Sequence, residues 1–145
     1  MMESTPKPQE LLEELKSLKD WESRCRYIVA LGQKLEPMTN EEKTDDTKLK
    51  GCQSSVWLDK RFCDGHILLK ADSDSAIIKG LVAIIVIFYS NKTPEEVLQF
   101  STTTFEKVGV SINFSQTRTN SLVGVIKSIQ AYALEKTSEK TVHEK

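Results

Sequence analysis

The chain has 145 residues, of which 39% are hydrophobic and 28% are charged. This length fits one domain, and this composition can bury a core, which argues against wholesale disorder. Twenty basic and 21 acidic residues give a formal net charge of -1, so no overall positive field favours general nucleic-acid binding.

Cysteine usage and hydropathy argue for a soluble protein of a reducing compartment. The three cysteines, at 25, 52 and 63, form neither a CxxC pair nor a cluster with metal-ligand spacing. The N-terminus is polar, with no visible signal peptide. The most apolar run, 76–89, is interrupted by Lys79 and is shorter than the ~20 residues of a membrane-spanning helix. We therefore expect a cytoplasmic protein without a membrane partner.

The first half of the chain predicts two helices and a hairpin. Leucines recur at helical spacing over 11–18, and a second amphipathic stripe follows over 21–35, with Asp20 as its N-cap. Residues 38–50 are polar and predict a mobile, solvated connection. Residues 55–71 then alternate around Cys63-Asp64-Gly65, a composition typical of a tight turn between two antiparallel strands.

The second half predicts helices. Asp72-Ser73-Asp74 supplies N-cap residues for a buried helix over the run that starts at 76, although its isoleucines and valines would also suit a strand. Thr93-Pro94-Glu95-Glu96 predicts a helix over 94–100. One or two helical turns are expected over 102–107, an extended segment over 109–116 and a last helix from Asn120.

These elements predict one α+β domain over 1–145, with a small antiparallel sheet packed against several helices. Residues 1–8 and 136–145 are expected to be flexible tails. The chain has no phosphate-binding loop, no GxGxxG and no HExxH, and its only histidines are His66 and His143. An independent hydrolase or metalloenzyme is therefore a weak interpretation.

Cys52 is the best candidate for chemistry. Gly51, Gln53 and Ser54 surround it with small and polar residues, and such a loop can present sulfur to a partner. Backbone N–H groups there could stabilise the reactive thiolate. The alternative is an inert thiol packed at the start of a strand, since a free cysteine often acts as a small hydrophobe.

Other polar residues carry weaker signals. Cys25 lies on the apolar stripe of the second helix and is expected in the core, whereas Cys63 lies in the predicted turn. Asp74 is expected to cap the following helix. Arg118 precedes the last helix and is either a surface charge or an anchor for an anion or a carboxylate.

At Cys52 the sequence Gly51-Cys52-Gln53-Ser54-Ser55-Val56-Trp57-Leu58 resembles the active-site signature of the SufE family. The likeness extends from about residue 10 to 135. Three further segments are similar to family motifs in the same order. The first is 21–33, with Trp21-Glu22-Ser23-Arg24 and Leu31-Gly32-Gln33. The second is 71–81, with Asp72-Ser73-Asp74 and Lys79-Gly80-Leu81, and the third is 117–122, with Arg118. The last segment departs from the family, because Thr117 and Ser121 replace its usual serine and glycine.

The resemblance implies a sulfur acceptor and carrier with the fold of IscU-type scaffolds. Cys52 would take persulfide sulfur from a cysteine desulfurase of the SufS type, stimulate that enzyme, and pass sulfur to an iron–sulfur scaffold complex of the SufBCD type. Pyridoxal phosphate would belong to the desulfurase, so no bound cofactor or metal is expected on this chain. A homodimer is also compatible with the family, and Gly51, Gln53, Ser54, Asp74 and Arg118 would support the loop or contact the partner.

Two alternatives remain open at this point. The chain could be a regulatory module that binds the desulfurase and stimulates it without carrying sulfur. It could also be a peroxide-sensing thiol protein in which Cys63 resolves an oxidised Cys52 as a disulfide.

Overall fold

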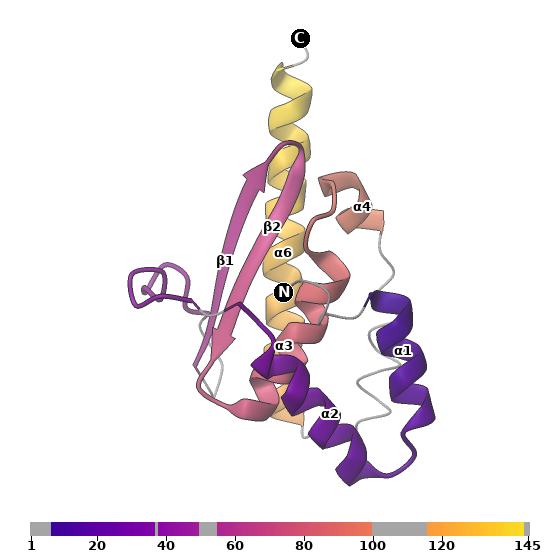
Figure 1. Cartoon of the computed structure of the whole chain (residues 1–145). Coiled ribbons are helices and arrows are strands. Elements are labelled where there is room, and N and C mark those ends of the chain that lie inside the picture. Colours follow the sequence, from indigo (N-terminus) through magenta and orange to yellow (C-terminus); the bar gives the residue numbers. More distant parts are fainter. Residues whose placement is uncertain (1–6, 37, 50–54, 100–115, 144–145) are drawn as a thin grey trace.

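The computed structural model describes residues 7–36, 38–49, 55–99 and 116–143; the side chains of Trp21 and of residues 116–123 and 139–143 are not among those described. The predicted α+β class is confirmed, because helices pack on one side of a two-stranded antiparallel sheet (Figure 1). In chain order the elements are α1 (Pro8–Ser17), α2 (Trp21–Gln33), β1 (Val56–Cys63), β2 (His66–Ser73), α3 (Ala76–Tyr89), α4 (Pro94–Gln99) and α6 (Gln116–His143).

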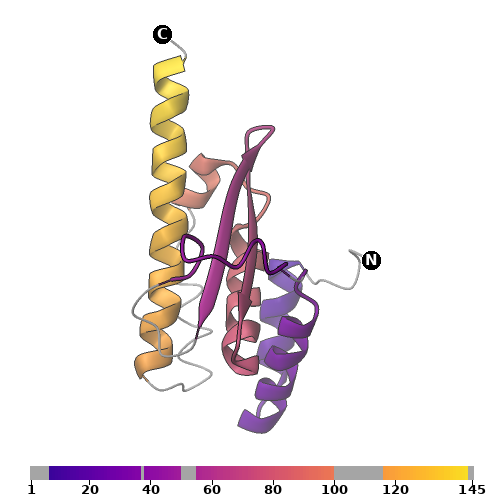
Figure 2. The same cartoon turned by 90° about the vertical axis from the view of Figure 1, so that its left-hand side faces the viewer.

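Helix α3 is the centre of the core. Most of its residues are buried, among them Leu81, Ile84, Ile85 and Tyr89. The hairpin and α6 run along one side of α3, and α1 and α2 lie on the other (Figures 1 and 2). A helix enclosed in this way is apolar around most of its circumference, which explains why its periodicity alone did not separate helix from strand.

The contact between α2 and α3 is a close approach of two backbones. A Cβ atom on Gly80 would lie 2.1 Å from the carbonyl oxygen of Ile28, and one on Gly32 would lie 2.8 Å from the backbone nitrogen of Gly80. Both values are below ordinary van der Waals separation. The two glycines therefore let the helices touch, and this contact fixes the position of α3 beside the sheet.

The hairpin is confirmed, with a two-residue turn. Its register runs from Val56 opposite Ser73 to Cys63 opposite His66. Asp64 and Gly65 both have positive φ, 53° and 79°, as a type I′ turn requires. One face of the hairpin packs on the core through residues that are all buried: Val56, Leu58, Ile67, Leu69 and Ala71.

The N-cap of α3 and both ends of α6 differ from the sequence prediction. The N-cap of α3 is Ser75, whose hydroxyl accepts a hydrogen bond from the Ile78 N–H, so neither Asp72 nor Asp74 is the cap. Helix α6 begins at Gln116, not Asn120. It also continues to His143, so 136–143 is helical and not an irregular tail. The turns expected over 102–107 lie outside the described residues, as does the extended segment expected over 109–116 except for Gln116, which is helical.

Replacing Gly80 with alanine should destabilise the fold, because the new methyl group would push the two helix backbones apart. We expect a loss of about 2 kcal/mol in the free energy of unfolding, typical of overpacking at a rigid contact. Urea denaturation measures this change.

Gly124 provides the matched control, because it is also helical but a Cβ there meets nothing within 4 Å. Its alanine variant should be neutral or more stable by up to about 1 kcal/mol, from helix propensity alone. Equal stability of the Gly80→Ala and Gly124→Ala proteins would contradict the proposed role of the Gly80 contact.

Candidate functional site

Ser55, the first described residue after the predicted cysteine loop, is held by the segment between β2 and α3. Its N–H donates to Asp74 Oδ1 at 3.1 Å. Its carbonyl oxygen accepts from the Asp74 N–H at 3.2 Å and from Ser73 Oγ at 2.7 Å. The chain that leaves the loop is thus fixed to the start of α3 by three hydrogen bonds.

The chain that enters the loop is held to the other edge of β1. The Leu49 N–H donates to the Val56 carbonyl at 2.8 Å, and the Leu58 N–H donates to the Thr47 carbonyl at 2.8 Å. Lys48 lies opposite Trp57 in an antiparallel bridge. The hydrogen bond between Leu49 and Val56 therefore holds together the described residues on either side of 50–54.

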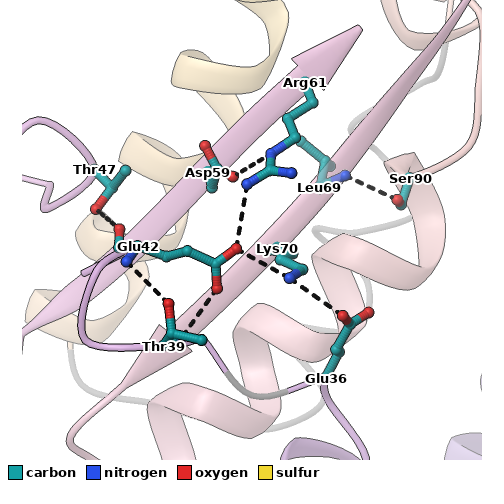
Figure 3. Close-up of polar contacts among 9 residues, drawn as sticks. All are labelled: Glu36, Thr39, Glu42, Thr47, Asp59, Arg61, Leu69, Lys70 and Ser90. Atoms are coloured by element: carbon teal, nitrogen blue, oxygen red, sulfur yellow. Dashed lines mark hydrogen bonds and ion pairs between the residues drawn. The ribbon is translucent and has the colours of Figure 1, made fainter. Parts of the chain in front are cut away.

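The segment over 39–49 has more structure than the mobile, solvated connection predicted from its composition. Thr39 and Glu42 form reciprocal hydrogen bonds, with the Thr39 N–H donating to Glu42 Oε1 and the Glu42 N–H donating to Thr39 Oγ1. Glu42 Oε2 also lies 3.0 Å from Lys70 Nζ and 3.2 Å from Arg61 on the hairpin (Figure 3). The charges therefore bind the segment to the outer face of the sheet.

Asp72 lies on that outer face, next to the segment. It is buried, and its carboxylate lies 2.8 Å from Lys43 and 3.3 Å from Lys79. Burial acts to raise the pKa of Asp72, but hydrogen bonds from Lys43, the Ser73 N–H and Lys79 outweigh it, and the pKa lies below 3.8. Asp72 is therefore ionised at neutral pH and links the segment, β2 and α3.

The predicted site residues divide into three groups. Asp74 is described and lies at the loop's exit, though it holds Ser55 and does not cap α3. Arg118 is in the first turns of α6, and its side chain is not described. Gly51, Cys52, Gln53 and Ser54 lie outside the described residues.

The first turns of α3 and α6 and the open end of the hairpin point toward the same end of the molecule (Figure 2). The topology thus gathers three segments singled out from the sequence: the start of β1 after the cysteine loop, the Asp72-Ser73-Asp74 segment, and the start of α6, to which Arg118 belongs.

Sequence reasoning missed Ser55, Ser73, Glu42 and Lys43. For Glu42 a signal was present, since Thr39 and Glu42 have the spacing of a capping box. No local pattern reveals Lys43, because its partner Asp72 is distant in the sequence.

Across the described ranges, no group of three or more His, Cys, Asp or Glu side chains has the arrangement of a metal site. In the same part of the chain, no helix combines the length and apolar character needed to cross a bilayer.

Comparison with known proteins shows the family of this chain. Residues 9–133 match the family model described as SufE, the Fe–S metabolism associated domain. This chain belongs to the SufE family. Membership connects it with iron–sulfur metabolism and sulfur transfer, with a cysteine desulfurase as partner.

The fold of this SufE-family chain is similar to a solved structure described as the solution structure of a hypothetical protein from Thermus thermophilus. The TM-score is 0.74 and the identity 19%, over 92% of this chain and 98% of the other. At this identity the likeness shows the shared fold.

Of the other two cysteines of this SufE-family chain, Cys25 is half-buried on α2 and Cys63 is exposed at the hairpin turn. Cys63 is eight residues from Ser55 along a strand, about 26 Å. Even a fully extended chain spans only about 11 Å between Ser55 and Cys52. At least about 15 Å then separates Cys52 from Cys63, more than the ~7 Å limit for a disulfide. The intact hairpin thus argues against Cys63 as a resolving thiol within one chain.

Removing the Asp74 carboxylate should loosen the exit of the cysteine loop. We expect Asp74→Ala to raise the rate at which a maleimide alkylates Cys52, by about threefold or more, because Ser55 loses the acceptor for its N–H. Asp74→Asn keeps an acceptor oxygen and should stay close to the wild-type rate. An Asp74→Ala protein with the wild-type rate would show that this hydrogen bond does not restrain the loop.

The carboxylates of the outer face should make stability depend on pH. In the folded protein the pKa values of Asp72 and Glu42 lie below the ordinary 3.8 and 4.5. Each ionised carboxylate therefore contributes its full stabilisation of the fold above its ordinary pKa, and this stabilisation is lost as pH falls through the pKa of the folded state. The urea midpoint of the wild type should exceed that of Asp72→Asn at pH 7, and the difference should narrow below about pH 4. A difference that stays constant down to pH 3 would be inconsistent with an ionised, ion-paired Asp72.

Proposed function

We propose that this chain accepts sulfur from a cysteine desulfurase on Cys52 and carries it as a persulfide. The observation that supports this most directly is that the residues flanking 50–54 are both fixed, Leu49 to β1 and Ser55 to the segment that leads into α3. Cys52 is at the middle of 50–54 in sequence, and the chain's membership of the SufE family connects it with sulfur transfer.

The proposed step is a thiol exchange. The Cys52 thiolate attacks the terminal sulfur of the partner's cysteine persulfide, and the sulfur–sulfur bond on the partner breaks. The partner's cysteine leaves as a thiolate, while the terminal S–H is now bonded to Cys52. One persulfide replaces another, so the step requires no oxidant or reductant.

A partly fixed loop suits this chemistry. The attacking and leaving sulfurs must lie in line with the transferred sulfur, and every backbone dihedral fixed beforehand reduces the entropy lost on docking. Hydrogen bonds at Leu49 and Ser55 fix the chain on both sides and leave five residues between them to reach the partner.

We further propose that the partner is of the SufS type, that it holds the pyridoxal phosphate, and that the sulfur goes on to an iron–sulfur scaffold complex of the SufBCD type in the cytoplasm. In this scheme the chain stimulates the desulfurase because it removes the persulfide and frees the enzyme's cysteine for another turnover. The chain itself then needs no cofactor.

This scheme predicts that stimulation depends on the Cys52 sulfur. Cys52→Ser should lose most of the increase in desulfurase turnover, measured as alanine released from free cysteine, because serine cannot accept a sulfane sulfur. Cys63→Ser is the control and should stimulate as the wild type does, since Cys63 lies at the far end of β1.

The regulatory module gives the opposite result. A protein that only reshapes the desulfurase would keep most of its stimulation after Cys52→Ser. That outcome would contradict sulfur acceptance and favour regulation by binding alone.

A further inference from the structure

Lys43 occupies an unusual place on the outer face of the hairpin. Its ammonium lies 2.8 Å from Asp72 Oδ2 and 5.0 Å from the centre of the Trp57 ring. Trp57 and Asp72 are opposite each other in the register of β1 and β2. One side chain from the segment before the loop thus contacts both strands of the hairpin.

This ion pair is mostly shielded from water. The side chain of Asp72 is 8% exposed and that of Lys43 is 28% exposed. Ion pairs on a fully exposed surface contribute little, whereas a shielded carboxylate that loses a partner carries a desolvation cost. Asp72 also keeps Lys79 as a second partner, so loss of the Lys43 charge alone would not leave the carboxylate unpaired.

The ion pair lies close to both ends of the cysteine loop. On the entering side, Lys43 is followed directly by the Thr44–Thr47 turn and then by the pairing of Thr47 and Leu49 with β1. On the exit side, Asp72 Oδ1 accepts from the Ser73 N–H at 2.7 Å, and the Ser73 hydroxyl donates to the Ser55 carbonyl. A continuous path of contacts therefore joins Lys43 to each end of the loop.

We propose that Lys43 is a positioning residue for sulfur transfer: its contacts with Asp72 and Trp57 hold the entering segment against the sheet and so limit how readily the Cys52 thiol is reached. This inference rests on the proposed function for the role of Cys52. It adds that a lysine nine residues away in the sequence affects how readily Cys52 is reached, while taking no part in the sulfur chemistry itself.

The test compares Lys43→Met with Lys43→Arg and Lys48→Met, all in a Cys63→Ser background so that the exposed second thiol does not react. Lys43→Met keeps the unbranched apolar stem of the side chain but removes its charge. Lys43→Arg keeps a positive charge at this position. Lys48→Met makes the same change in net charge closer to Cys52, at an exposed lysine for which the described residues show no ion pair. The readout is the rate of maleimide alkylation of Cys52, located by peptide mapping, without the desulfurase.

We expect Lys43→Met to alkylate about threefold faster or more, because the entering segment opens more often, with Lys43→Arg and Lys48→Met close to the background rate. Hydrogen exchange gives a second readout. The Leu49 and Leu58 amides, which pair across β1, should exchange faster in Lys43→Met. The Ile67 amide, bonded to the Lys92 carbonyl on the far edge of the hairpin, should not change.

Three results would overturn the proposal. The first is an unchanged alkylation rate in Lys43→Met. The second is equal acceleration in Lys48→Met, which would indicate a general charge effect. The third is faster exchange at Leu49 and Ile67 alike, which would reveal a global loss of stability. Because the desulfurase is absent from these assays, their failure is distinguishable from a failure of Cys52 to accept sulfur.

Discussion

The carbonyl and N–H of Ser55 are the point at which the hairpin, α3 and the cysteine loop meet. Ser73 and Asp74 end β2 and lead into α3, and both bind Ser55 at the start of β1. The contact depends on α3 being fixed first, which the close approach of Gly80 to Ile28 ensures. One backbone hydrogen bond and two hydrogen bonds to short side chains therefore fix the chain where it enters β1.

Backbone hydrogen bonds hold both sides of the loop, but the side chains that add to them differ in kind. Short polar side chains hold the exit at Ser55, and their hydrogen bonds leave little freedom for the backbone. Longer charged side chains hold the entering segment, through Glu42 with Lys70 and Lys43 with Asp72. Charged pairs of this kind exchange partners more easily than a backbone hydrogen bond in a sheet.

Much of the fold was accessible from sequence because local signals agree with the tertiary structure. The Asp20 cap, the Asp64-Gly65 turn and the Thr93-Pro94 helix start each act over a few residues, and all three are present. The predictions were wrong where the local structure depends on contacts with residues distant in the sequence. Aspartate often caps helices, but the Asp74 carboxylate accepts a hydrogen bond from the N–H of Ser55, which lies 19 positions earlier in the sequence. The N-cap of α3 is Ser75 instead. The order of 39–49 likewise depends on Lys70 and Arg61, which its own sequence does not reveal.

For the candidate site, the sequence identified Cys52 through motifs and not through spacing. Spacing alone left Cys52 undecided between a reactive and an inert thiol, and four ordered motifs shared with the SufE family favoured the first. The structure gives physical reasons for parts of those motifs. Gly32 and Gly80 allow two helices to touch, Asp72 binds two lysines, and Ser73 and Asp74 hold Ser55.

The central claim is that Cys52 accepts sulfur, and intact-mass spectrometry under non-reducing conditions tests it most directly. The protein is incubated with a cysteine desulfurase of the SufS type and free cysteine. We predict a mass gain of about one sulfur atom, ~32 Da, which is absent from Cys52→Ala and retained in Cys63→Ala. A gain that persists in Cys52→Ala, or no gain while the desulfurase is still stimulated, would contradict the account.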